Sequence, residues 1–222
     1  MGSRSLFSSS VPESMPPGVR RASELPRYRE GKEIDTAAAE KPPREVMNEG
    51  AGSSVIELLG NAALTAAVRW TAEAQGRGEQ VAWVNAREES FFPPDLAANG
   101  VDLEALPVIS PQERDEAVEA IDTLMRSGFF SLIVVDWNMQ WSLEGALQTR
   151  FLRLGRHHGV TLLFLVEENA THGIALVPLR IRAERRREAP GLYRLKLEVI
   201  RDKRGFGMTR QEEAAHGPPG LR

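Results

Sequence analysis

The feature that most constrains the fold of this chain is an unbroken aliphatic run, Leu132 to Val135, that ends in Asp136. A run without polar alternation is typical of a strand buried on both faces of a parallel sheet. Parallel neighbours need crossover connections of a dozen or more residues, which are usually helices. The run therefore predicts an α/β fold with this strand near the centre of the sheet.

Strand-like and helix-like segments alternate around this run. Strands are predicted at 55–59, 81–84, 106–109 and 160–166, and helices at 62–75, 111–127 and 142–156. Asn61, Ser110 and Ser142 are residue types that cap helix N-termini. Residues 179–183 and 192–200 alternate apolar and polar side chains on either side of a Pro-Gly turn, which predicts antiparallel strands. The expected fold is a mostly parallel sheet flanked by helices, with a C-terminal antiparallel hairpin.

The domain organisation follows from local composition. Residues 1–45 are rich in Ser, Pro, Arg and Glu, which predicts a disordered N-terminal arm. The arm is either a solubilising tail or a partner-binding segment, with Leu6-Phe7 and Leu25 as its apolar anchors. Residues 46–207 are predicted to form one core domain and residues 208–222 a flexible tail. Because no apolar stretch resembles a signal peptide or a membrane span, we expect a cytoplasmic protein.

Composition excludes several function classes. The chain has no cysteine, so thiol redox chemistry, disulfides and cysteine-ligated metals are excluded. The four histidines show no metal-ligand spacing, and we predict no metal site. A formal net charge of -3 gives no global attraction to phosphate backbones, so any nucleic-acid contact must come from a local patch.

The phosphate site common in α/β folds is missing from its usual place. The first strand and helix are joined by a short turn, Gly60-Asn61-Ala62-Ala63, with no lysine nearby, and Thr65 lies inside the predicted helix. A Walker A loop needs more residues, a lysine for the β and γ phosphates, and a Ser or Thr for magnesium. Asp136 matches the position of a Walker B carboxylate, but without that lysine a structural strand-end role is the favoured interpretation. We predict no catalytic residues and no bound cofactor.

Two groups of side chains are candidates for contact with a partner or with DNA. Trp137, Met139 and Trp141 follow Asp136 and are residue types found at interface hot spots, although they would equally well cover the core. The second group is basic: Arg180, Arg182, Arg185, Arg186, Arg187, Lys203 and Arg204. Two glutamates interrupt the arginines and no aromatic residue is interleaved among them, so a solvated turn is an equally good interpretation.

Several segments together resemble the RecA family and, more closely, its reduced relative ImuA, which accompanies the polymerase-like ImuB in bacterial translesion synthesis. The similarity extends from about Val55 to Gly205. Its carriers are Ile56–Gly60, Ala82–Ala86 with Gly100–Asp102, Ser127-Gly128 with Leu132–Asp136, and Leu195–Gly205.

This resemblance implies a RecA-like fold without its chemistry. Arg87 stands where RecA places its catalytic glutamate, the phosphate loop is shortened, and the DNA-binding loops are cut down. The implied role is a non-catalytic adaptor in SOS-induced mutagenic translesion synthesis that binds ImuB, RecA or both, with weak single-stranded DNA contact as a further possibility. Two alternatives are a cell-division inhibitor of the SulA type, also a shortened RecA relative, and a nucleotide-gated switch.

Overall fold

A computed structural model describes residues 19–21, 55–87, 91–138, 140–167, 174–189, 192–203 and 210–216. Across these residues one nine-stranded sheet has the order β1-β4-β3-β5-β6-β2-β7-β8-β9. Its strands are β1 (Val19–Arg21), β2 (Val55–Leu59), β3 (Val81–Asn85), β4 (Pro107–Ile109), β5 (Leu132–Asp136), β6 (Thr161–Val166), β7 (Leu179–Ala189), β8 (Leu192–Asp202) and β9 (Arg210–His216).

The pairing of these strands confirms the predicted fold class. The six strands from β4 to β7 pair in parallel, whereas β1, β8 and β9 are antiparallel to their neighbours. Residues of β2, β3 and β5 are all buried, as expected for strands covered on both faces. The predicted C-terminal hairpin is β7 and β8, which are longer than the sequence pattern indicated.

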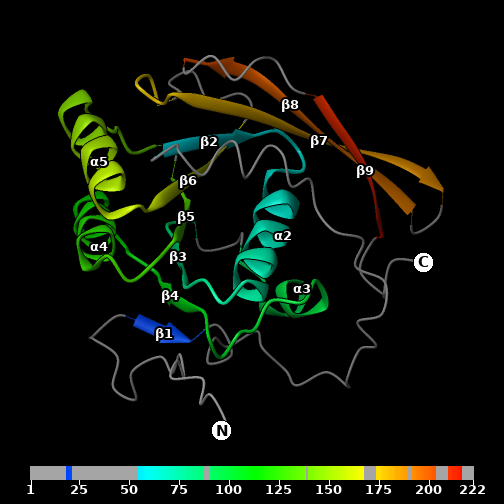
Figure 1. Ribbon diagram of the computed structural model, residues 1–222, viewed down its shortest axis with the longest axis horizontal. Helices are drawn as coiled ribbons and strands as arrows, with labels where there is room; N and C mark the ends of the chain where they lie inside the picture. The colour runs from blue at the N-terminus through cyan, green and yellow to red at the C-terminus, as the bar shows by residue number, and fades with distance from the viewer. Residues whose placement is uncertain are drawn as a thin grey trace, which may run out of the picture.

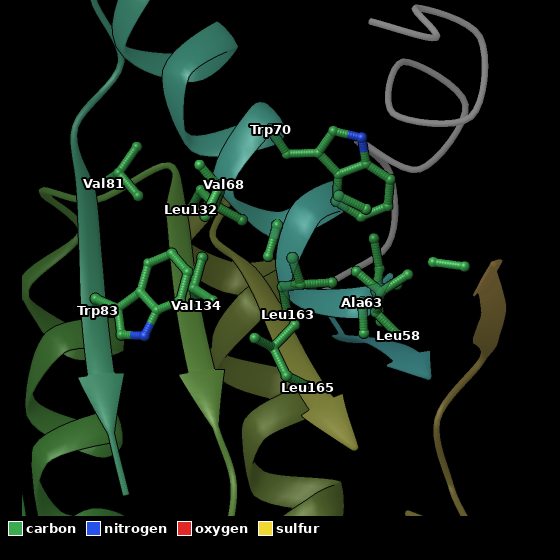
Figure 2. Close-up of a cluster of buried hydrophobic side chains, with 14 of the residues drawn as sticks. Leu58, Ala63, Val68, Trp70, Val81, Trp83, Leu132, Val134, Leu163 and Leu165 are labelled. Carbon is green, nitrogen blue, oxygen red and sulfur yellow. The ribbon is translucent and has the colours of Figure 1, made fainter. Parts of the chain in front are cut away.

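Helices cover both faces of the parallel strands (Figure 1). They are α2 (Ala63–Gly76), α3 (Pro93–Ala98), α4 (Arg114–Ser127) and α5 (Gly145–His158). One core lies between α2, α3 and the sheet, where Trp70 and Trp83 pack among aliphatic side chains from β2, β3, β5 and β6 (Figure 2). The second core lies under α4 and α5 and contains Ile121, Met125 and Phe151. Among the described residues, no helix is long and apolar enough to cross a bilayer.

The predicted helix caps are wrong. The helices begin at Ala63, Arg114 and Gly145, and none has a side-chain hydrogen bond at its N-cap. Asn61 instead uses its Oδ1 to accept a hydrogen bond from the backbone N–H of Arg185 in β7, at 2.8 Å. A tertiary contact has therefore replaced the local cap, because the turn before α2 lies directly against a neighbouring strand.

Two short strands lie in segments that were expected to lack structure. β1 falls in the predicted N-terminal arm and pairs with β4, and β9 falls in the predicted tail and pairs with β8. Both are edge strands, whose sequences need carry no buried alternating pattern. The anchors Leu6-Phe7 and Leu25 lie outside the described residues, and the domain boundaries 46–207 stay a prediction.

Candidate functional site

The candidate site lies where the parallel strands end. The carboxyl ends of β2, β3, β5 and β6 meet at one edge of the sheet, because these strands are parallel and adjacent. In open α/β sheets ligands bind in the crevice beyond these ends. Two features occupy this edge: the turn at Gly60, and an ion pair between Arg87 and Asp136.

The turn between β2 and α2 is closed by strand β7. Gly60 has a φ of +103°, and the N–H of Ala63 donates to the Gly60 carbonyl at 3.1 Å. The N–H of Ala62 donates to the carbonyl of Ala183 at 3.2 Å. In a phosphate-binding loop, backbone N–H groups at this position point at the ligand. Here the N–H groups of Ala62 and Ala63 are already bonded to protein carbonyls, those of Ala183 and Gly60.

Asp136 at the end of β5 is held by an arginine. Its side chain is 1% exposed, and its Oδ1 accepts a hydrogen bond from Nε of Arg87 at 2.7 Å. Nη1 of Arg87 also donates to Oε1 of Glu167, at 2.8 Å. Asn85 pairs with Asp136 in the β3–β5 ladder, which places Arg87, two residues later, over the end of β5. The carboxylate that would organise a divalent cation is thus paired with a guanidinium.

The tryptophans after Asp136 cover the core. Trp137 is 1% exposed, and its Nε1 donates to the carbonyl of Trp141 at 3.1 Å. Its ring makes edge contacts with those of Trp141, at 5.6 Å, and Phe164, at 5.8 Å between centroids. The prediction that Trp137 contacts a partner is therefore wrong, because Trp137 is a core residue. Trp141 is half-buried against the same cluster, and Met139 lies outside the described residues.

The basic residues separate into structural and exposed ones. Arg180 binds the buried carboxylate of Glu57, with Nε at 2.9 Å and Nη2 at 2.8 Å from Oε2. Its guanidinium is therefore engaged in an ion pair, while its side chain is 26% exposed and its role as a contact stays a prediction. Arg182 is half-buried, whereas the side chains of three consecutive arginines and of one lysine are exposed: Arg185, Arg186, Arg187 and Lys203. Arg204 lies outside the described residues.

Comparison with known proteins shows that part of this sequence is similar to one family. The RecA N-terminal domain family matches residues 50–145. The protein RecA of Fusobacterium nucleatum is 39% identical over 85 residues, which are 37% of this chain and 22% of that protein. RecA of a Nocardioides species is 41% identical over 86 residues, which are 37% of this chain and 24% of that protein. RecA of Rhodospirillum rubrum is 38% identical over 85 residues, which are 37% of this chain and 23% of that protein.

The matched region is RecA-like. It contains the Gly60 turn, Arg87 and Asp136, so both features of the candidate site lie within it. Strands β7 and β8, with the arginines, come after the match ends at residue 145. The aligned segments span less than a quarter of the length of these RecA relatives.

Two ion pairs could not be predicted from the sequence: Arg87 with Asp136, and Arg180 with Glu57. Arg87 was noted as a departure from the catalytic glutamate of RecA, but its ion pair with Asp136 depends on β3 and β5 lying side by side. Glu57 was taken as part of an apolar strand. A glutamate inside such a strand is a signal that a basic side chain lies nearby, since buried charges are almost always paired.

The buried Glu57 leads to a prediction on pH dependence. Burial raises its pKa above 4.5, and the hydrogen bond and charge of Arg180 only partly offset this effect. A raised pKa in the folded state means that the group's contribution to stability is full below pH 4.5 and is lost as pH rises through the folded pKa. Glu57→Gln removes this titration. We measure the free energy of unfolding in urea for Glu57→Gln and for wild type at several pH values above 4.5. The difference, variant minus wild type, should increase with pH. A difference that stays constant or decreases would contradict the assignment.

Proposed function

We propose that this chain is a RecA-like adaptor without ATPase activity, which acts in SOS-induced mutagenic translesion synthesis by binding RecA, the polymerase-like ImuB, or both. The observation that carries the proposal is the ion pair between Arg87 and the buried Asp136. Phosphoryl transfer in RecA-like and related folds depends on a magnesium ion, a phosphate loop and a residue that positions water. In this chain the guanidinium of Arg87 is bound to the carboxylate of Asp136. The turn at Gly60 is hydrogen-bonded to the carbonyl of Ala183.

The retained fold supports a binding role. The identity of about 40% to RecA proteins, over 37% of this chain, is our reason to expect a surface related to that of RecA. Such a surface needs no bound nucleotide in order to dock on a protein that normally contacts RecA. On this proposal the residues of the phosphoryl-transfer chemistry are lost, while the strands and helices that shape the domain remain.

The deciding experiment is a binding titration of the purified protein against RecA, with and without single-stranded DNA and ATP, with ImuB as a second ligand. We expect saturable binding to at least one of them. The affinity should be the same whether or not the adaptor is incubated with ATP before it is mixed with its partner. Addition of magnesium and ATP to the adaptor alone should not raise its melting temperature beyond the effect of added salt. A SulA-type inhibitor would instead bind the tubulin-like protein of cell division. Failure to bind RecA and ImuB, together with capture of that division protein in a pull-down, would replace the proposal with a division-inhibitor function.

The exposed arginines of β7 give a second test of the proposed function. Replacing Arg185, Arg186 and Arg187 with Ala should weaken association with the partner or with DNA. Because the three side chains are exposed, the free energy of unfolding should fall by less than about 1 kcal/mol. A matched control is the double variant Arg153→Ala and Arg156→Ala, which removes exposed arginines from α5. Equal binding by the triple variant and wild type would remove this patch from the proposal.

A further inference from the structure

The helices α4 and α5 form a layer with an exposed outer face. Both helices pack on the same side of the sheet and lie next to each other (Figure 1). Each connects two strands that run in the same direction, β4 with β5 and β5 with β6. The two helices therefore run in the same direction as well, with matching ends.

Side-chain contacts fix how the two helices are aligned. At their N-terminal ends, Nη2 of Arg114 donates to Oε1 of Glu144 at 2.8 Å. Halfway along the helices, Nη2 of Arg150 donates to Oδ2 of Asp122 at 2.7 Å. The layer consequently has one end formed by both N-termini and another formed by both C-termini.

The charges on the outer face of this layer are divided between its two ends. The N-terminal end carries the exposed carboxylates Asp115, Glu116 and Glu119 of α4, and the C-terminal end carries the exposed guanidinium groups of Arg153 and Arg156 of α5. Residues three and four positions apart share one side of a helix, so each group forms a single stripe. Within the described part of the chain, Glu119, Arg153 and Arg156 have no ion-pair partner.

The helix dipole explains only part of this division. Acidic side chains in the first turn and basic ones in the last turn stabilise a helix, and the effect falls off within that turn. Asp115 and Glu116 lie in the first turn of α4, and Arg156 lies in the last turn of α5. Glu119 and Arg153 lie further inside their helices, so the division extends beyond what helix stability requires.

We propose that the outer face of α4 and α5 binds a second copy of this chain in a two-fold symmetric dimer. A two-fold axis that lies in the interface and crosses both helices turns the second copy end for end. The acidic end of each copy then meets the basic end of the other, and the same contact is made twice. Between the two ends, Thr123, Ala146 and Thr149 are exposed and small, so the helices of the two copies can approach closely.

The division of charge is what favours a second copy over another protein. A uniformly acidic or basic partner would be attracted by one end of the face and repelled by the other. A reversed copy of the same face matches both ends at once. The dimer goes beyond the adaptor function, and its surface is separate from the arginines of β7.

The experiment is sedimentation velocity of the full chain, at concentrations up to on the order of 100 μM and in about 50 mM or about 500 mM salt. Wild type should form dimers at the lower salt concentration and monomers at the higher one, because exposed ion pairs are weak and are screened by salt.

Two double variants each reverse the charge of one end. The acid-reversed variant carries Glu116→Arg and Glu119→Arg, and the base-reversed variant carries Arg153→Glu and Arg156→Glu. Each variant alone should self-associate more weakly than wild type by about 10-fold or more, since like charges then face each other. Circular dichroism and the melting temperature of each variant check that it folds. Glu119→Arg and Arg153→Glu alone replace any double variant that does not fold.

An equimolar mixture of the two reversed variants is the decisive sample. In a mixed dimer the two reversed ends face each other and so do the two unreversed ends, so both attractive contacts are restored. We expect the mixture to dimerise as wild type does, although neither variant does so alone.

A matched control reverses charge elsewhere on the molecule. Asp95→Arg with Glu104→Arg changes the net charge as the acid-reversed variant does, but at exposed carboxylates in α3 and in the loop that follows it. This control should dimerise like wild type.

Several outcomes would overturn the proposal. These are a monomeric wild type at low salt, an equal loss in the control variant, a mixture that stays monomeric, or assemblies that grow beyond the dimer. A monomeric wild type whose binding to RecA or ImuB is lost in either reversed variant would assign this face to the partner of the adaptor instead. Because the sedimentation assay contains no other protein, its failure leaves the adaptor function to be judged by the protein titration.

Discussion

Gly60→Ala is expected to destabilise the chain by about 3 to 5 kcal/mol, which is a large share of the stability of an ordinary domain. A Cβ at this position would lie 2.3 Å from the carbonyl oxygen of Ala183, a backbone atom that cannot rotate away. The residue also has a φ of +103°, which side-chain-bearing residues adopt only with strain. Urea unfolding followed by tryptophan fluorescence measures the loss.

Gly78→Ala is the matched control for this variant. Gly78 also has a positive φ, +78°, but no atom lies within 4 Å of the position of its added Cβ. Its substitution carries the backbone strain without the collision, so a loss of about 1 kcal/mol is expected. If both variants lost the same free energy, the close packing of β7 against the Gly60 turn would not be what fixes glycine there.

Arg87→Met should have the second large effect, a loss of about 2 to 4 kcal/mol. The substitution leaves the carboxylate of Asp136 without its guanidinium partner in a position that is 1% exposed. Removing one member of a buried pair typically costs about 3 to 5 kcal/mol, and the lower range applies because the Arg87 side chain is 30% exposed. Thermal and urea unfolding of the purified variant measure the change.

A double-mutant cycle separates this pair from its surroundings. Adding Asp136→Leu to Arg87→Met removes the unpaired charge and should restore much of the lost stability. Arg77→Ala is the exposed comparison: Arg77 pairs with Glu79 at 2.6 Å on the surface, and its loss should cost less than about 1 kcal/mol. An Arg87→Met variant as stable as Arg77→Ala would contradict the central role given to the ion pair.

The sequence predicted those parts of the fold that depend on local pattern. The aliphatic run from Leu132 to Val135 indicated an inner strand of a parallel sheet, and β5 has this position. Alternation after Pro178 indicated the antiparallel hairpin of β7 and β8. In both cases the period of buried positions is set by the geometry of one strand, so it can be recognised without knowledge of the rest of the chain.

The details of the candidate site depended on strand order, which local pattern does not contain. Ala183 follows Gly60 by more than 120 residues, and they meet only because β7 adds to the sheet beside β2. The same neighbour relation took Asn61 away from its expected capping role. Tyr193 reached Arg185 through the hairpin register, whereas in the sequence it stands apart from the arginine cluster.

The contact of β7 with the Gly60 turn has a consequence for any attempt to build a phosphate loop at this position. A full-length phosphate loop inserted between Leu59 and Ala63 would need the space now taken by the carbonyl of Ala183. It would also break the hydrogen bond that joins Asn61 to Arg185. Building such a loop therefore requires rebuilding the C-terminal hairpin as well, since the turn and β7 are joined by these hydrogen bonds.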